Sequence, residues 1–481
     1  MIPKWARSVL LILAAIGLVW AIYRDIRYGR PFSYDLRNRI VGARLEKDGR
    51  LPYFYKWRKG DGFRYYDPQN FDSLAVSNIT ASPFFHQLMI PLAEGDQEKI
   101  KGWWLFLEYG MLTLMVAMAL SLAGTVGEGD TLDLHLTPLE RNPVRPVDLV
   151  PKRLPPVYQQ RGAVLFVASL FLLTDAWQHH VYRGQNYLCI PLLSMACYFF
   201  IRQRPTAFRA LMAGIMAALL VGIRPNALIF LLPFFFLFNS YGRRYWMIFL
   251  IPLLLLAAWT LIDKKELSLW QDYRSAMGQH IKEHQELHPA LIQNDPSPNY
   301  PRWEGVNIPA LDSAEIDNPM KGHSENGNVF VIFKNFFHWK IAPPLLFIGS
   351  LFLIAALAVL FWFYRIRKGD DDPAAIAILA YSLYMISDLF SPIYRHQYYT
   401  VQWIFPLLLA AALVRPRWKT PFGLMMAGLL LNISKTGFIP MQHTLGEYLI
   451  LAALLLQAFL YKNAGSQQAP TRLGTKTPEA R

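Results

Sequence analysis

The sequence is dominated by long apolar runs that contain almost no charged residues. Clear examples span residues 8–23, 103–124 and 341–364. Runs of about 15 to 22 apolar residues match the length that a helix needs to cross the hydrocarbon core of a bilayer. The chain as a whole is 53% hydrophobic and only 17% charged, which is too apolar for an ordinary soluble enzyme. The sequence therefore predicts an all-α polytopic membrane protein.

We expect about twelve transmembrane helices, and the positions of the cations test this number. The expected spans lie near residues 8–23, 103–123, 162–178, 187–201, 206–223, 226–239, 245–262, 341–364, 373–390, 400–414, 421–433 and 444–461. Clusters of Lys and Arg fall in alternate connectors, whereas the short connectors of the other set hold only isolated cations. By the positive-inside rule, both termini are cytoplasmic.

The net charge of +14 does not indicate a nucleic-acid partner. The cations lie in short connectors and not on one amphipathic face or in a patch interleaved with aromatic residues. The two cysteines, Cys189 and Cys197, share one apolar run, which excludes a disulfide framework or a cysteine-based zinc site.

This topology divides the chain into four regions. Residues 1–262 form an N-terminal transmembrane module that includes a first external loop (24–102), and residues 263–340 form a long external loop. Residues 341–462 hold the C-terminal transmembrane helices, and 463–481 form a basic cytoplasmic tail that we expect to be disordered. In the first loop, the apolar spacing after Asp35 predicts a short interfacial helix, and 83–92 predicts another. The second loop is expected to be irregular with short helices.

Ionisable side chains gather at the outer ends of the expected spans. The set comprises Glu108, Asp175, His179, His180, Arg224, Asp388, Arg395, His396, His443 and Glu447. Charged groups within a membrane are costly and usually functional. A proton-coupled transporter would place them near the middle of the membrane, so their position favours an active site at the outer face.

Several short strings in the sequence resemble one enzyme family. They are Tyr34-Asp35-Leu36, Gly49 to Pro52-Tyr53, Ser82-Pro83-Phe84-Phe85-His86, Gly184-Gln185-Asn186, Gly222-Ile223-Arg224-Pro225-Asn226, and Ser391-Pro392 with Arg395 and Gln397-Tyr398. Together they resemble the polyprenyl-phosphate-mannose-dependent mannosyltransferases of glycosyltransferase family 87, within the GT-C superfamily. The resemblance covers roughly the first four hundred residues and does not extend to the loop 263–340.

The resemblance implies a GT-C type bundle, interfacial helices in the first external loop and a catalytic acid in that loop, here Asp35. A sugar on a lipid phosphate already has a good leaving group, so the reaction chiefly needs one base. Arg224 and Arg395, with His396 as a weaker candidate, are expected to bind the donor phosphate, because guanidinium groups bind phosphate oxygens in a bidentate fork. Possible supporting polar residues are Asp175, His180, Arg183, Gln185, Asn186 and Asp388.

Each of these residues has a purely structural alternative. Asp35 could cap the helix that follows it. Arg224 could lie at the interface or pair with Asp175 or Asp388. Gln185 and Asn186 could be polar contacts between helices. We expect no bound metal, and no cofactor apart from the polyprenyl-phosphate sugar, which is a substrate.

The sequence thus predicts an inverting glycosyltransferase that moves a single sugar, mannose or a related one, from polyprenyl phosphate to a lipid-linked or envelope glycan. It would lie in a bacterial cytoplasmic membrane with its active site facing the periplasm. Its expected partners are membrane lipid, the lipid-linked donor and a glycan or glycolipid acceptor. An O-antigen ligase or polymerase and a lipid-linked oligosaccharide transporter are the alternatives. Sugar, acceptor, linkage and oligomeric state are left open by the sequence.

Overall fold

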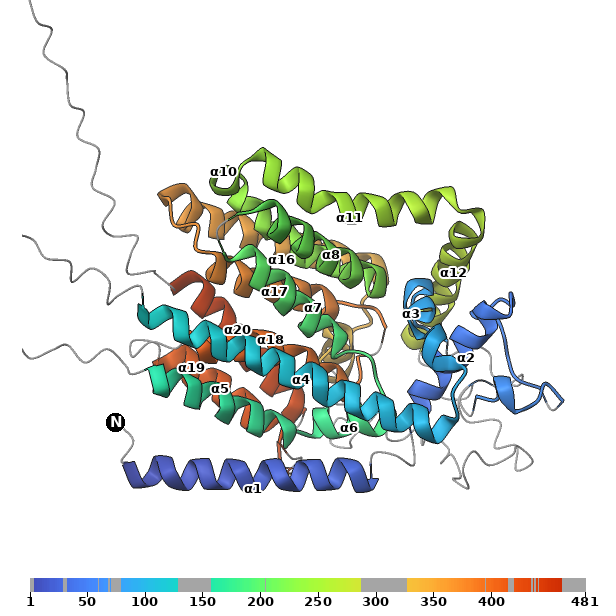
Figure 1. Cartoon of the computed structure of the whole chain (residues 1–481), viewed down its shortest axis with the longest axis horizontal. Helices are drawn as coiled ribbons and strands as arrows, with labels where there is room; N and C mark the ends of the chain where they lie inside the picture. The colour runs from blue at the N-terminus through green and yellow to red at the C-terminus, as the bar shows by residue number, and fades with distance from the viewer. Residues whose placement is uncertain are drawn as a thin grey trace, which may run out of the picture.

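The computed structural model describes residues 4–28, 33–58, 60–67, 70, 79–128, 157–203, 205–286, 327–393, 395–413, 419–433, 436, 438–439 and 441–460. These residues form a bundle of helices with a smaller helical group at one end (Figure 1). The expected tail 463–481 lies outside the described residues.

Most of the helices belong to the bundle. They are α1 (Lys4–Tyr28), α4 (Gln97–Glu128), α5 (Val157–Leu172), α7 (Cys189–Ile201), α8 (Ala207–Ile223), α9 (Leu228–Leu231), α10 (Phe238–Tyr241), α11 (Arg243–Ile262), α16 (Pro343–Tyr364), α17 (Pro373–Leu389), α18 (Ile404–Ala412), α19 (Lys419–Leu431) and α20 (Gln442–Leu460). Short 3₁₀ segments connect or extend them: η2 (Pro225–Ala227), η3 (Leu232–Leu237), η5 (Ile366–Lys368) and η6 (Gln397–Trp403). Helix α18 is buried along its whole length and forms part of the bundle core.

Four helices in the described part of the chain are long and apolar enough to cross a membrane, namely Gln97–Ala123, Arg243–Ile262, Pro343–Lys368 and Gln442–Leu460. Helices α5 and α6 (Asp175–Arg183) add a fifth if they are counted as one span bent by 60°. Further apolar helices of 10–17 residues pack beside them. The structure confirms an all-helical membrane protein, and the count of twelve spans stays a prediction.

Close contacts between bundle helices depend on small residues. A Cβ atom added to Gly214 would lie 2.2 Å from the carbonyl oxygen of Phe249, so α8 and α11 touch at the backbone. On α19, a Cβ added to Gly428 would lie 2.5 Å from the carbonyl oxygen of Gly446 on α20. Lipid chains are as apolar as leucine, so helices in a membrane gain stability from such close packing and not from escaping water.

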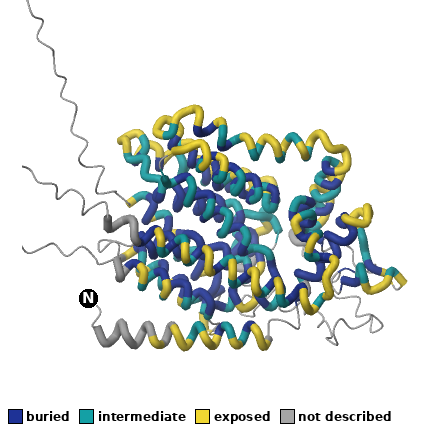
Figure 2. Tube along the Cα trace, viewed as in Figure 1, coloured by how far each residue is buried: buried dark blue, intermediate teal, exposed yellow. Residues whose placement is uncertain are grey.

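The outer helices present large apolar side chains to their surroundings. Helix α11 and the described C-terminal part of α1 are largely exposed (Figure 2). On α11, Leu254 and Leu255 are 63% and 65% exposed, and Phe352 on α16 is 75% exposed. Apolar surface of this extent is unusual for a soluble monomer and matches a lipid-facing belt.

Helices α2 (Tyr34–Lys47), α3 (Pro83–Ala93) and α12 (Lys264–Glu286) gather at the end of the bundle opposite the start of α1 (Figure 1). The 3₁₀ segment η1 (Phe63–Tyr65) and helix α15 (Val329–Phe337) complete the described elements. The two helices expected after Asp35 and at 83–92 are present as α2 and α3, and their interfacial position stays a prediction.

The long loop expected at 263–340 differs from its prediction. It begins with α12, a regular helix of 23 residues, where we expected irregular structure with short helices. Its first half is rich in Lys, Glu, Leu and Gln, which favour helix, and the Pro, Asn and Asp that suggested a loop follow after residue 286. Residues 287–326 lie outside the described part.

Candidate active site

Asp35 lies in the first turn of α2, where it contacts the loop that follows α6. Gln185 donates a hydrogen bond to its Oδ2, and Nη1 of Arg183 lies 3.7 Å from the same oxygen. Arg39, one turn further along α2, donates to the side chains of Gln185 and Asn186. The sequence strings around Asp35 and around Gln185-Asn186 therefore meet in one hydrogen-bonded cluster.

The start of α2 has a different capping residue from the one that the sequence suggested. Ser33 occupies the N-cap position with a φ of 30°, and its side chain makes no capping bond. Its backbone N–H donates to the carbonyl of Tyr182 over 2.8 Å, which fixes the start of α2 against α6. The Asp35 carboxylate is directed to Gln185 and Arg183 and is not the helix cap.

Gly184 lets α2 and α6 approach closely enough for this cluster to form. Its φ is 66°, a left-handed conformation that ends α6, and its N–H donates to the carbonyls of His180 and Val181. A Cβ atom added there would lie 2.6 Å from Cβ of Leu36. Both the conformation and the contact require glycine.

We expect Gly184→Ala to reduce activity strongly. The strained conformation alone costs about 1–3 kcal/mol, and relief of the clash with Leu36 moves Arg183 and Gln185 away from Asp35. The measurement is the rate of sugar transfer together with the thermal unfolding temperature. Gly162→Ala on α5 is the matched control, because nothing lies within 4 Å of the added Cβ; if both variants behave alike, the packing argument is wrong.

A second charged cluster is centred on Asp388, near the end of α17. Its Oδ1 accepts a hydrogen bond from Arg224, which follows α8, and its Oδ2 accepts one from Nε of Arg395 over 2.7 Å. Arg395 also donates to Glu447 on α20. Glu447 in turn accepts bonds from Thr400 (2.7 Å) and from Trp403 (3.0 Å). Two arginines and two carboxylates thus join α8, α17, η6 and α20.

Three tyrosines connect the Asp388 cluster to the Asp35 cluster. The guanidinium of Arg224 lies 5.3 Å from the ring of Tyr187 and 5.5 Å from that of Tyr399. The Tyr187 and Tyr399 rings are 4.0 Å apart, and Tyr398 lies 5.3 Å from Tyr399. Arg183 lies 5.7 Å from the Tyr398 ring. The two arginines therefore flank one aromatic surface, and we treat both clusters as one candidate active site.

The three arginines of this site differ in accessibility. The side chains of Arg183 and Arg224 are 27% and 23% exposed, whereas that of Arg395 is 1% exposed. Burial alone would lower the pKa of Arg395, but Glu447 and Asp388 outweigh burial and raise it. Arg395 is thus a permanently charged, enclosed group, and Arg183 and Arg224 are the cations that a ligand can reach.

The other expected polar residues lie around this site. His396 is exposed, and its ring stacks on Tyr398 with 5.2 Å between centroids. Asp175 lies 3.5 Å from His443, whose Nδ1 is 2.6 Å from Gln397. His180 lies 3.2 Å from the buried carboxylate of Glu108. Asp175, Asp388 and Glu108 are therefore engaged separately, and the described residues hold no group of three side chains suited to a metal.

Sequence reasoning did not assign roles at this site to Arg39, Tyr187 or Glu447. Arg39 follows Asp35 by one helical turn, a spacing that places both on the same face and that could have drawn attention to it. Tyr398 belongs to the string Gln397-Tyr398 that resembles the family, and the neighbouring Tyr399 was assigned no role at this site. Their contact with Tyr187 joins segments far apart in sequence, which spacing alone does not reveal.

A comparison with protein families matches a central part of the chain that includes residues of both clusters. Residues 80–292 match glycosyltransferase family 87. The match confirms the resemblance found in the sequence and indicates a membrane glycosyltransferase. It includes Arg183, Gln185 and Arg224, whereas Asp35 precedes it and Asp388 and Arg395 follow it. A search of curated proteins found no match to the chain.

Proposed function

We propose that this glycosyltransferase moves a single sugar, mannose or a related one, from a polyprenyl monophosphate to a hydroxyl group of a glycan or glycolipid acceptor. Asp35 is the general base. The observation that supports this most is the meeting of α2, α6 and η6, which brings one carboxylate and two accessible arginines to a shared tyrosine surface.

One oxygen of the Asp35 carboxylate is fixed by neighbouring side chains, and the other can accept a proton from the acceptor. Gln185 and Arg183 both contact Oδ2, and among the described residues Oδ1 accepts no hydrogen bond. The side chain is 15% exposed, so an acceptor hydroxyl can reach it. A base must come within hydrogen-bonding distance of the proton that it removes, and Oδ1 offers that position.

The chemical step needs one general base and no general acid. Asp35 takes the proton from the acceptor hydroxyl while that oxygen forms a bond to the anomeric carbon. The bond between this carbon and the phosphate oxygen breaks, and its electron pair leaves with the polyprenyl phosphate. Attack from the face opposite the phosphate inverts the anomeric configuration, as in the base-assisted half of inverting glycosidases. A leaving phosphate is stabilised by cations without protonation.

The cations that serve this step are Arg224 and Arg183 in our proposal. Nε of Arg224 is buried without a hydrogen-bond partner, and its guanidinium is only partly neutralised through Asp388. Arg395 is enclosed by Asp388 and Glu447, so we assign it a positioning role: it holds the carboxylate that orients Arg224.

The outer face of a bacterial cytoplasmic membrane remains our proposed location for the reaction. Helices α2, α3 and α12 lie at the end of the bundle remote from the start of α1, and Asp35 is in the first turn of α2 (Figure 1). With the N-terminus cytoplasmic, as the connector charges predict, that end faces the periplasm. The exposed apolar belt gives a lipid-anchored donor access from the side.

We expect changes at Arg224 to weaken donor binding. Arg224→Ala removes a charge-assisted contact to phosphate, worth roughly 1.5–3 kcal/mol or about 10- to 100-fold in Kd. Arg224→Lys keeps the charge beside Asp388 but loses the planar fork, so its effect should be smaller but measurable. Native mass spectrometry of polyprenyl monophosphate binding gives the affinity.

Arg64→Ala is the matched control for this test, because Arg64 is an exposed arginine that pairs with Asp48 and Glu94 away from the site. Its donor affinity should equal that of the wild type. An unchanged donor affinity in Arg224→Ala would remove Arg224 from the proposed phosphate site.

A further inference from the structure

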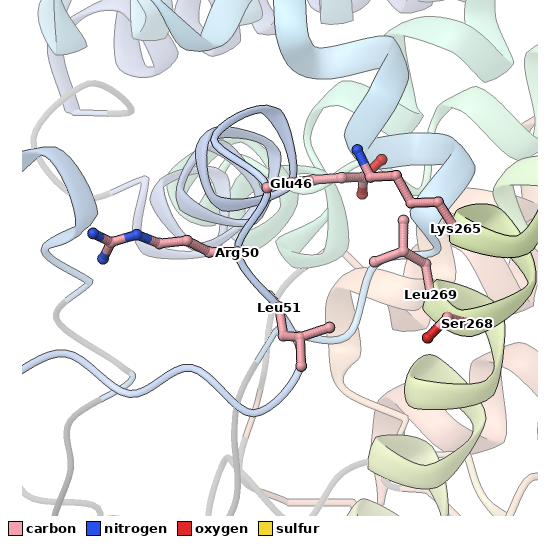
Figure 3. A pocket seen from close by; sticks show the side chains of 7 residues that line it. Glu46, Arg50, Leu51, Lys265, Ser268 and Leu269 are labelled. Atoms are coloured by element: carbon pink, nitrogen blue, oxygen red, sulfur yellow. The ribbon is translucent and has the colours of Figure 1, made fainter.

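A cavity of about 190 Å³ lies between the end of α2 and the start of α12 (Figure 3). Its lining consists of Glu46, Gly49, Arg50, Leu51, Lys265, Ser268 and Leu269. None of these residues belongs to the Asp35 or Asp388 cluster. The cavity is therefore a separate site, whose lining combines two leucines with carboxylate, ammonium and hydroxyl groups.

Glu46 gives this cavity an unsatisfied hydrogen-bond acceptor. The residue is 4% exposed, and its Oε2 accepts no hydrogen bond. Nδ1 of His86 lies 3.5 Å from this oxygen, and neither ring nitrogen of His86 makes a hydrogen bond. A buried carboxylate oxygen without a donor is costly, so a ligand that donates hydrogen bonds is favoured there.

Glu266, the neighbour of Lys265 in the cavity lining, also has a carboxylate oxygen without a hydrogen-bond donor. It is 6% exposed, Gln87 donates to its Oε1, and its Oε2 accepts no hydrogen bond. Burial, and then the nearby charge of Glu46, raise the pKa of Glu266. Two neighbouring acidic groups disfavour an anion. With the Ser268 hydroxyl and the Lys265 side chain in the lining, the cavity suits a neutral polyol, whose hydroxyls both donate and accept.

A line of aromatic contacts runs from His86, beside Glu46, to Tyr273 on α12. His86, beside Glu46, lies 5.7 Å from the ring of Tyr53, and Tyr53 lies 5.5 Å from Tyr273 on α12. Burial raises the pKa of Tyr273, Arg224 opposes that rise and Tyr399 adds to it, so this tyrosine lies within electrostatic reach of both. Leu269 at the cavity precedes Tyr273 by one helical turn, about 6 Å along α12.

We propose that the cavity between α2 and α12 is a saccharide subsite, in which Glu46 binds a neutral hexosyl unit of the acceptor remote from the hydroxyl that receives the new sugar. This assignment rests on the proposed function. The acceptor then extends from Asp35 along α2, and Glu46 lies about 16 Å further along that helix. The subsite contributes to acceptor affinity and not to the chemical step.

The test measures transfer kinetics with a glycolipid extract from cells that lack this chain, in which the unused acceptor accumulates. Glu46→Gln should raise the KM for the extract roughly tenfold or more, because it removes a charged hydrogen-bond acceptor, and should leave kcat within about twofold. Ser268→Trp, which fills the cavity from an exposed position, should raise the KM similarly. Donor affinity should stay unchanged in both.

Ser275→Trp is the matched control: Ser275 is exposed on the same helix but does not line the cavity. A folded Ser268→Trp protein with the wild-type KM, or with a KM no higher than that of Ser275→Trp, overturns the subsite. Binding of the extracted glycolipid without donor, measured by native mass spectrometry, gives the same comparison independently of catalysis. Failure of the proposed function would appear differently, as absence of transfer by the wild-type protein.

Discussion

Asp35→Asn is expected to lower kcat for sugar transfer by about 10²- to 10⁴-fold, the usual contribution of a positioned general base. Asparagine has the same shape and can still bond to Gln185, but it cannot take a proton from the acceptor hydroxyl. Donor affinity and thermal stability should stay near the wild-type values. The measurement is the initial rate with saturating donor and glycolipid extract.

Asp48→Asn is the control for Asp35→Asn, because Asp48 ends the same helix and its carboxylate pairs with Arg64. It should retain kcat within about twofold, since a surface ion pair contributes at most about 1 kcal/mol. Wild-type turnover by Asp35→Asn would show that Asp35 is a structural residue of α2 and that another group is the base.

Asp388→Ala is expected to destabilise the protein by about 3–5 kcal/mol, because it leaves the guanidinium groups of Arg224 and Arg395 without a shared carboxylate. The side chain of Asp388 is 1% exposed, so water cannot replace it. We also expect weaker donor binding, because Arg224 loses its orientation. Unfolding in detergent, followed by tryptophan fluorescence, measures the change in stability.

Glu94→Gln is the comparison for this prediction. Glu94 also pairs with two cations, Lys47 and Arg64, but its side chain is 43% exposed. Its loss should cost far less than the loss of Asp388, because solvent screens an exposed ion pair. Equal effects of the two variants would mean that the Asp388 cluster contributes no more than a surface pair.

The fold class and the presence of the helices α2 and α3 were predictable from local pattern. Apolar runs of spanning length identify the bundle, and the spacing after Asp35 predicts α2, because both signals repeat within a few residues. The break between α5 and α6 was missed. Thr174 marks it, since its side chain accepts a hydrogen bond from the N–H of Trp177 and begins a new helix.

The contacts of the candidate site were only partly predictable. Asp175 and Asp388 were both possible partners of Arg224 from the sequence, and the structure shows Asp388. The sequence placed Arg224 and Arg395 together as phosphate ligands, but the enclosure of Arg395 by Asp388 and Glu447 depends on how α17 and α20 pack. Such pairings join residues far apart in the chain, and no local period encodes them.

The central claim is transfer of one sugar from a lipid monophosphate, and its most direct test is product analysis with purified protein. The protein is incubated with a polyprenyl-monophosphate sugar and the glycolipid extract, and mass spectrometry follows both lipids. We predict that the acceptor gains the mass of one sugar for each polyprenyl monophosphate released. Use of only a diphosphate-linked oligosaccharide, or lipid movement without any new glycolipid, would contradict the account.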